Sequence, residues 1–170
     1  MGYAIRAYAV DEYCVGAFWR SDDDATIAQA LASPLGQFRL RDTPAVRDAL
    51  AEMAKGTSPV GDQPNGAPYL YATEILCAYY GAKAGEELRL SPRGIDAAPE
   101  LKLFMASSPM FPKVRAPDFP AMCAWGKKQV ARRLAAHQSW PATLHYERDV
   151  YMSWLRNAAD RKVALVGFYY

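Results

Sequence analysis

The sequence is poor in the residues that usually bind metal ions. Its 170 residues include two histidines, His137 and His145, which lie eight positions apart with Pro141 between them. No H-x-x-x-H or C-x-x-C pattern accompanies them, although zinc sites usually show such spacing. We therefore expect no metal centre, and we expect both histidines at the surface or in a hydrogen-bonded core position.

Cysteine is also scarce. Cys14, Cys77 and Cys123 are odd in number and widely spaced, which fits free thiols in a reducing compartment better than a disulfide framework. Each has apolar or aromatic neighbours, so burial as a small hydrophobic side chain is the favoured interpretation. Cys123 precedes a basic segment, which makes a reactive thiol of lowered pKa the less favoured alternative.

Long apolar runs and cofactor motifs are missing as well. No segment approaches the ~20 apolar residues that span a bilayer, and the N-terminus lacks the apolar core of a signal peptide. We therefore expect no membrane association and a cytoplasmic location. No G-x-S-x-G elbow occurs, and Gly126-Lys127-Lys128 lacks the upstream glycine and the following Ser or Thr of a phosphate-binding loop. The sequence thus predicts no cofactor and no catalytic residue, and it leans against an enzyme.

What the sequence does contain is typical of a globular protein. Hydrophobic residues make up 51% and charged residues 22% of the chain, and large aromatic side chains are plentiful, with four Trp and eleven Tyr. A chain of this length is the usual size of one domain. We therefore expect residues 1–170 to form a single domain.

Both ends of the chain read as strands. Residues 2–10 place Tyr3, Ile5, Ala7 and Ala9 on one face, and residues 162–170 are dense in β-forming side chains. Because 163–168 is apolar throughout, it is expected as an interior strand, since an exposed edge of this composition would favour aggregation. The expected fold is α+β, with a small sheet built from the two terminal strands and packed against a mostly helical middle.

Helices are expected between these strands. Asp11, the run Ser21–Asp24 and Thr43-Pro44 each suit a helix start, and Gly56 suits a helix end. The helix over 69–80 has Glu74 as its only charge and is expected at the centre of the fold. The expected helices follow Asp11 through Trp19, run from Ser21 past Leu31, and cover 43–56, 69–80, 97–106, 124–137 and 147–160. The other expected segments are a surface loop over 56–68, a short strand or turn over 86–90 and a Pro-rich connector over 109–120.

The helix over 124–137 carries the clearest candidate for a binding surface. Lys127, Lys128 and Arg132 share one side of it, with Arg133 further round, while Val130 and Leu134 mark its buried side. Such a stripe is usually a solvated face, but it also suits an acidic protein partner. Nucleic acid is disfavoured as a partner, because neither interleaved aromatic side chains nor a helix-turn-helix pattern accompanies the stripe.

Three stretches resemble an uncharacterised group of small bacterial proteins. They are YAIRAYAVD (3–11), YLYATEILCAYYG (69–81) and WLRNAADRKVALVGFYY (154–170). The resembling motifs are structural, and no activity comes with them. Small single-domain proteins of this type include immunity partners of bacterial toxins, so the resemblance implies an immunity-type role by analogy.

The favoured function is a non-enzymatic protein-binding domain, either toxin-neutralising or regulatory. Abundant Tyr and Trp favour interfaces, and the charge is split, because residues 1–85 hold seven Lys/Arg against ten Asp/Glu while 86–170 hold thirteen against eight. The alternative is an enzyme or small-ligand binder whose site assembles only in three dimensions, and the third is a nucleic-acid-associated protein. A formed pocket with perturbed titratable groups would favour an enzyme or small-ligand binder over a protein-binding domain. The partner's identity and the oligomeric state stay open.

Overall fold

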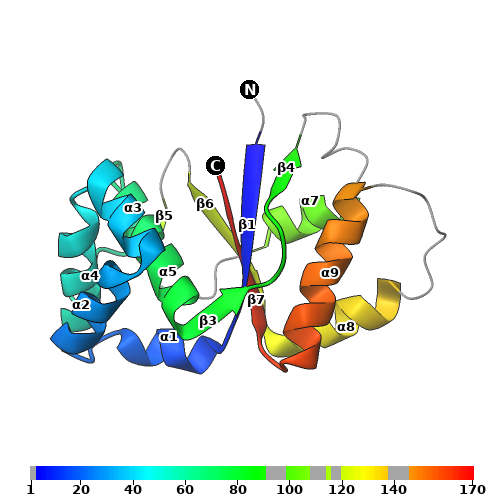
Figure 1. Cartoon of the computed structure of the whole chain (residues 1–170), viewed down its shortest axis with the longest axis horizontal. Coiled ribbons are helices and arrows are strands. Elements are labelled where there is room, and N and C mark those ends of the chain that lie inside the picture. Colours follow the sequence, from blue (N-terminus) through cyan, green and yellow to red (C-terminus); the bar gives the residue numbers. More distant parts are fainter. Residues whose placement is uncertain (1–2, 91–98, 108–113, 116–119, 138–145) are drawn as a thin grey trace.

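A five-stranded antiparallel sheet lies at the centre of the fold (Figure 1). The computed structural model describes residues 3–90, 99–107, 114–115, 120–137 and 146–170. The strands of this sheet are β3 (Gly81–Lys83), β4 (Leu88–Leu90), β1 (Tyr3–Val10), β7 (Ala164–Tyr169) and β6 (Ala121–Trp125). β7 lies between β1 and β6, while β3 and β4 share the other edge of β1.

The two terminal strands are direct neighbours in this sheet. β1 pairs with β7 from Ile5–Tyr169 to Val10–Ala164, so opposite ends of the chain are joined by one ladder. The predicted α+β fold, with a sheet built from the N- and C-terminal strands, is therefore confirmed. The interior position predicted for 163–168 is confirmed as well, because β7 has a strand on each side.

Helices cover both faces of the sheet (Figure 1). Helices α1–α5 pack on one face and α7–α9 on the other, so the sheet separates two apolar clusters. Side chains alternate between the clusters along β1: Tyr8 and Val10 belong to the first, and Ile5, Ala7 and Ala9 to the second. The helices are α1 (Glu12–Phe18), α2 (Asp24–Ala32), α3 (Pro34–Asp42), α4 (Val46–Lys55), α5 (Ala67–Tyr80), α7 (Pro99–Met105), α8 (Lys127–His137) and α9 (Tyr146–Asp160).

Several helix ends lie where the sequence predicts them. Asp11 caps α1 by accepting from the N–H of Tyr13, and Asp23 caps α2 by accepting from the N–H of Thr26. Gly56 ends α4 in the left-handed conformation, at φ 71°, which glycine adopts without strain. The helix predicted at the centre of the fold is α5, and seven of its residues are buried.

The structure corrects the predicted start of the helix over 124–137. Ala124 and Trp125 belong to β6, and α8 begins only at Lys127. Helices cover both faces of the sheet here, so Met122 to Trp125 are all buried. A strand that is apolar on both faces shows no alternation, and its pattern resembles that of a buried helix.

Further corrections concern 34–56 and the segments on either side of α5. Thr43 ends α3 rather than starting α4, which begins at Val46 with no side-chain cap. The predicted loop over 56–68 contains the two-residue strand β2 (Gly61–Asp62), paired in parallel with β5 (Val114–Arg115). Gly81 ends α5 as predicted, but it also starts the unpredicted β3. Most of the Pro-rich connector over 109–120 lies outside the described residues.

Gly167 in β7 gives a test of this packing. A Cβ atom there would lie 2.7 Å from Cε1 of Phe104 and 2.8 Å from Sγ of Cys123. We expect Gly167→Ala to lower the free energy of unfolding by about 1–3 kcal/mol, the usual cost of overpacking. Gly16→Ala is the control, because no atom lies within 4 Å of that Cβ position and alanine favours helix α1 by about 0.5–1 kcal/mol. Urea denaturation measures both, and equal effects would contradict the packing argument.

Candidate functional site

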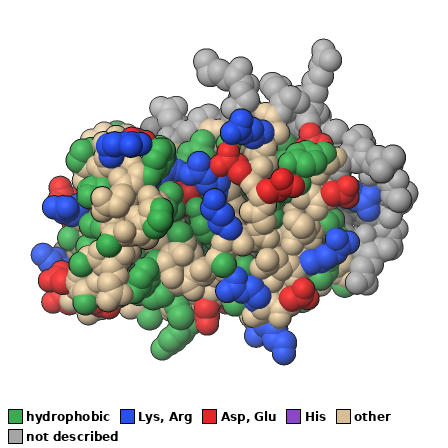
Figure 2. All heavy atoms as spheres, in the orientation of Figure 1, with side chains coloured by type: hydrophobic (Ala, Val, Ile, Leu, Met, Phe, Trp, Pro, Cys, Tyr) green, Lys and Arg blue, Asp and Glu red, His purple; other side chains and the backbone are tan. Residues whose placement is uncertain are grey.

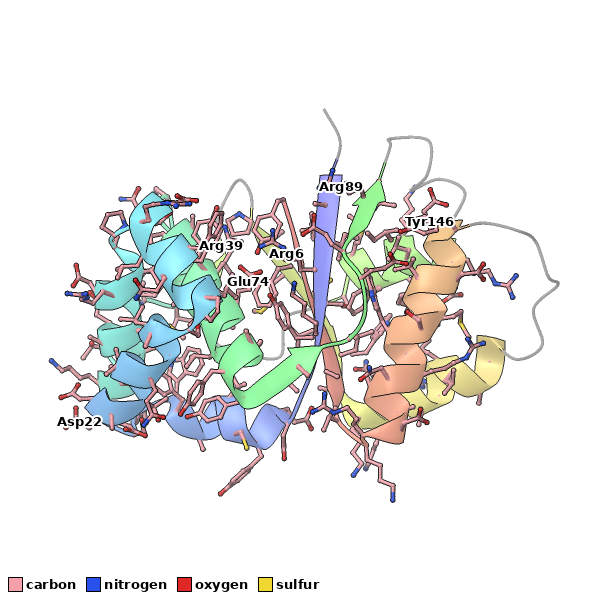
Figure 3. The ribbon with its side chains drawn as sticks, in the orientation of Figure 1. Arg6, Asp22, Arg39, Glu74, Arg89 and Tyr146 are labelled. Atoms are coloured by element: carbon pink, nitrogen blue, oxygen red, sulfur yellow. The ribbon has the colours of Figure 1, made fainter. Side chains whose placement is uncertain are left out.

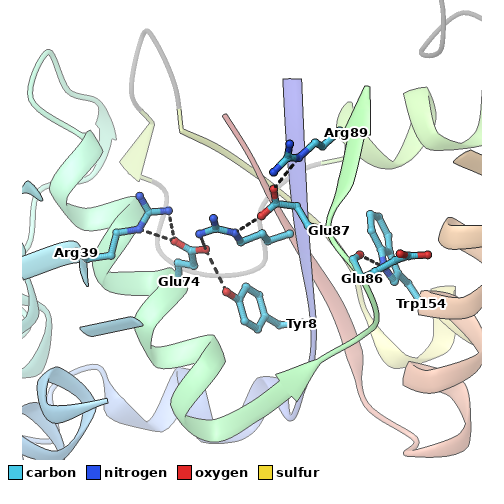
Figure 4. A network of polar contacts seen from close by, with 8 residues as sticks. Tyr8, Arg39, Glu74, Glu86, Glu87, Arg89 and Trp154 are labelled. Carbon is cyan, nitrogen blue, oxygen red and sulfur yellow. Dashed lines mark hydrogen bonds and ion pairs between the residues drawn. The ribbon is translucent and has the colours of Figure 1, made fainter. Parts of the chain in front are cut away.

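A fully buried carboxylate lies between α5 and the sheet. Glu74 of α5 has no exposed surface, and both of its oxygens are hydrogen-bonded. Arg39 of α3 donates from Nε and Nη2 to Oε2, at 3.0 and 2.6 Å, and the hydroxyl of Tyr8 donates to Oε1 at 3.1 Å (Figure 4). A buried charge needs such partners, because its transfer out of water is otherwise very costly.

Arg6 connects this buried carboxylate to the surface. Its Nη1 lies 3.7 Å from Oε1 of Glu74, and its Nε donates to Oε2 of Glu87 at 2.6 Å. Beyond it, Nε of Arg89 lies 3.7 Å from Oε1 of Glu87. The Arg6 and Glu87 side chains are 28% and 29% exposed, so the polar chain runs from the core to solvent (Figures 3 and 4).

The alternation of β1 places two of these groups on one face. Arg6 and Tyr8 are two residues apart, so both point toward α5, which carries Glu74. Tyr170 joins them because its backbone pairs with Ala4 in both directions. The result is a cluster contributed by the first strand, the segment after the last strand and the central helix.

Arg39 is held by aromatic rings as well as by charge. Its guanidinium carbon lies 4.1 Å from the ring centroid of Tyr71 and 4.7 Å from that of Tyr170. The two rings are stacked, with centroids 6.2 Å apart and planes 10° apart. Arginine suits this place because a planar guanidinium pairs with a carboxylate and stacks on rings at once.

Burial and neighbouring charges shift the pKa values of Tyr8, Tyr170 and Arg6. Burial, reinforced by the charge of Glu74, raises the pKa of Tyr8 far above its ordinary value, and the same causes raise the pKa of Tyr170. Burial lowers the pKa of Arg6, but its hydrogen bond to Glu87 and the charge of Glu74 outweigh that effect and raise it. The tyrosines are thus neutral and the arginine charged at neutral pH.

A cavity of about 480 Å³ adjoins this polar chain. Arg6, Tyr8, Lys83 and Glu87 line its sheet side, while the start of α3 and Ala78 of α5 form the opposite wall. That wall presents Ser33, Pro34, Leu35 and Phe38. On the face of the molecule shown in Figure 2, basic and acidic side chains gather along the middle, next to hydrophobic ones.

The predicted partner-binding residues lie elsewhere. Lys127, Lys128 and Arg132 are exposed on α8, which packs on the opposite face of the sheet from α5. Val130 is buried, as expected from the helical wheel. Arg133 faces inward: its Nη1 lies 3.5 Å from Oε2 of Glu100, and its guanidinium carbon lies 4.8 Å from the ring centroid of Trp125.

Among the described residues, neither the cysteines nor the residue types that bind metals form a recognisable site. Cys77 and Cys123 are buried, and burial raises the pKa of both thiols, which argues against the less favoured reactive Cys123. Cys14 is only partly buried. In the part of the chain that the structure describes, no three His, Cys, Asp or Glu side chains gather so as to hold a metal ion. His145 lies outside that part.

Comparison with known proteins places the chain in a family. A family model, the domain of unknown function DUF7691, matches residues 1–170. The chain belongs to this family. Membership in an uncharacterised family is thereby confirmed, while a bacterial source stays a prediction. No curated protein and no solved structure matches the chain. Among the described helices, none has the length and hydropathy needed to cross a bilayer.

The sequence signals for this site were uneven. Glu74 stood out as the only charge in an apolar helix, and Arg6 lies in an otherwise apolar strand. No sequence pattern indicates Arg39. Gly36 and Arg39 are the buried residues of α3, so this helix shows no apolar periodicity. Gly36 is required there for close approach, since a Cβ atom would lie 2.3 Å from the Ala30 carbonyl oxygen.

The Arg39–Glu74 pair predicts a large effect of one substitution. Arg39→Met leaves a buried carboxylate with weaker partners, so we expect the free energy of unfolding to fall by about 3 kcal/mol or more. Arg41→Met in the same helix is the matched control. Arg41 is 74% exposed and pairs with Asp42 at the surface, so its loss should cost at most about 1 kcal/mol.

Chemical denaturation of both variants measures this difference. Arg39→Lys should lie between them, because it keeps the charge but loses the paired hydrogen bonds and the ring stacking. That variant also gives a reading if Arg39→Met does not fold. Equal costs for Arg39→Met and Arg41→Met would contradict a structural role for the pair.

Proposed function

We propose that the protein binds a small organic anion in the cavity between α3 and β1. The supporting observation is the cavity itself, at about 480 Å³, with an arginine, a lysine and a tyrosine facing an apolar wall. Ligand sites commonly have volumes of roughly 300–1,000 Å³ and combine apolar walls with a few polar groups. Such a site corresponds to the small-ligand alternative raised by the sequence.

The charge around the cavity favours an anion. Two carboxylates, Glu74 and Glu87, are opposed by four cations, which are Arg6, Arg39, Lys83 and Arg89. No carboxylate of a described residue lies within 4 Å of the Lys83 amino group. The cavity therefore has a positive excess that a negatively charged ligand would neutralise.

The rigidity of the walls also supports binding. Arg6 and Tyr8 lie on a strand with neighbours on both edges, and Glu74 fixes both side chains. A recognition group that is already held loses less conformational entropy when it meets its ligand. The opposite wall offers Pro34, Leu35 and Phe38, so the ligand is expected to join a negative group to an apolar body.

Three probes of one skeleton test this proposal: phenylpropionate, its amide phenylpropionamide and the amine phenylpropylamine. We expect the acid to bind, and the neutral and positive analogues to bind more weakly or not at all. Lys83→Gln should weaken the acid about two- to fivefold, the effect of an exposed charge pair. Ala78→Phe should abolish binding by filling the cavity. Isothermal titration calorimetry measures the affinities.

Lys127→Gln is the matched control for Lys83→Gln, because it removes one exposed charge on the far face of the sheet. It should leave the affinity unchanged. Equal binding of acid, amide and amine would contradict recognition of a negative charge. Equal weakening by the two lysine variants would show that only the net charge matters.

A second candidate is the protein-binding function predicted from the sequence, with an immunity-type or regulatory role. It is favoured by one observation: Lys127, Lys128 and Arg132 are all exposed on one helix, and no described carboxylate pairs with them. Three such cations on one helix suit an acidic partner, where charge complementarity chiefly raises the association rate.

Charge reversal tests this second candidate. A partner is isolated on the immobilised protein from its native host, and its affinity is then measured with the variant K127E/K128E/R132E. We expect at least a tenfold loss, mainly in the association rate. The control R47E/K55E/R156E makes the same charge change at exposed sites outside α8 and should bind normally. Unchanged affinity after reversal in α8 would exclude this surface, and a gel shift of DNA or RNA at about 50 mM salt would favour nucleic acid instead.

A further inference from the structure

We propose that Arg6 forms a carboxylate subsite of the cavity and that Glu87 occupies this subsite until a ligand's carboxylate takes its place. This inference rests on the proposed function and names the chemical class of the ligand: a carboxylate attached to an apolar body. It also assigns Glu87 a role: without a ligand, its carboxylate occupies the position that the ligand's carboxylate would take.

The contact between Glu87 and Arg6 has the geometry of ligand recognition. Nε of Arg6 donates to Oε2 of Glu87 at 2.6 Å, a short charge-assisted hydrogen bond. Both side chains line the cavity and are less than one-third exposed. A guanidinium edge matches a planar carboxylate, so a free carboxylate would meet the same donors that Glu87 now meets.

The backbone around Glu87 leaves its side chain free to move aside. β1 pairs with Lys83 through Tyr8 and with Leu88 through Ile5, and the Ala84 N–H still bonds to the Ala7 carbonyl. Residues 85–87 therefore leave the ladder opposite Arg6, as in a β-bulge. The backbone that carries the Glu87 side chain is therefore not held by a ladder hydrogen bond to β1.

Arg6 stays paired when Glu87 leaves. Its Nη1 remains 3.7 Å from Glu74, while Glu87 can turn toward Arg89, whose side chain is 88% exposed. Exchanging one partly exposed ion pair for another costs little. The subsite can therefore pass from Glu87 to a ligand without leaving an unpaired buried charge.

Glu86 provides the matched control. It is the residue before Glu87 and carries the same charge, but it lies on the α9 side of the sheet, next to Trp154 (Figure 4). Its backbone carbonyl accepts from Nε1 of Trp154 at 3.1 Å, which an alanine side chain does not disturb. Glu86→Ala and Glu87→Ala thus change the charge equally, and only the second frees Arg6.

The first experiment needs no knowledge of the natural ligand. Glu87→Ala leaves a carboxylate-sized gap beside Arg6, so formate or acetate should raise the Tm of this variant saturably. Chloride at equal ionic strength and acetamide should not do so. In Glu86→Ala the Glu87 carboxylate still occupies the place beside Arg6, and in Glu87→Gln the glutamine side chain fills it. Acetate should therefore raise the Tm of neither variant beyond the effect of chloride.

The second experiment measures phenylpropionate by calorimetry. If Glu87 occupies the subsite for nine-tenths of the time, its removal should raise the affinity about tenfold. Glu86→Ala should differ from the wild type by about twofold at most, as expected for a screened surface charge. Glu87→Ser, whose short side chain also leaves the subsite empty, gives the same comparison for phenylpropionate if Glu87→Ala does not fold.

Either of two results would overturn the inference: acetate stabilising Glu87→Ala no more than Glu86→Ala, or phenylpropionate binding equally to both. The proposed function fails in a different way. Suppose that Glu87→Ala binds acetate and phenylpropionate while the wild type binds no acid. This result would support the subsite and its occupation by Glu87. It would contradict the proposed function, which is ligand binding by the wild-type cavity.

Discussion

The buried carboxylate of Glu74 is the constraint on which the rest of the structure depends. A charge with no exposed surface must be met by donors, and these come from two distant parts of the chain: Tyr8 and Arg6 of β1, and Arg39 of α3. Apolar packing would accept many alternative arrangements, but a buried ion pair stabilises only the one that satisfies it. The hydrogen bonds and ion pairs of Glu74 thus join β1 and α3 to α5.

The same constraint creates the cavity. Because α3 is attached through Arg39 and the close approach of Gly36, few of its other side chains are buried, although Leu35 packs in part against the core. Leu35 and Phe38 can therefore stand as a wall opposite Arg6. On the far face of the sheet, α7–α9 pack through apolar contacts and the Arg133–Glu100 ion pair, and they leave α8 with an exposed basic side. Recognition of a small anion and recognition of a protein would thus use opposite faces.

Much of the fold could be predicted from local patterns, but the site could be predicted only in part. The terminal strands, most helices and the caps at Asp11 and Asp23 follow from periodicity and hydrogen-bonding chemistry that neighbouring residues determine. β6 was missed because burial on both faces removes its alternation. Arg39 was missed because its partner lies 35 residues away on another helix, and no local pattern records such a pairing.

The pairing of β1 with β7 has a kinetic consequence. Its partners, such as Ile5 and Tyr169, lie at opposite ends of the sequence, so this ladder closes a loop of almost the whole chain. Contacts of such high sequence separation slow folding, because the entropy of closing the loop is lost before the contacts form. During synthesis one edge of β1 stays unpaired until β7 has emerged. The apolar strands at the heart of the native sheet are therefore the segments most exposed to misassociation beforehand.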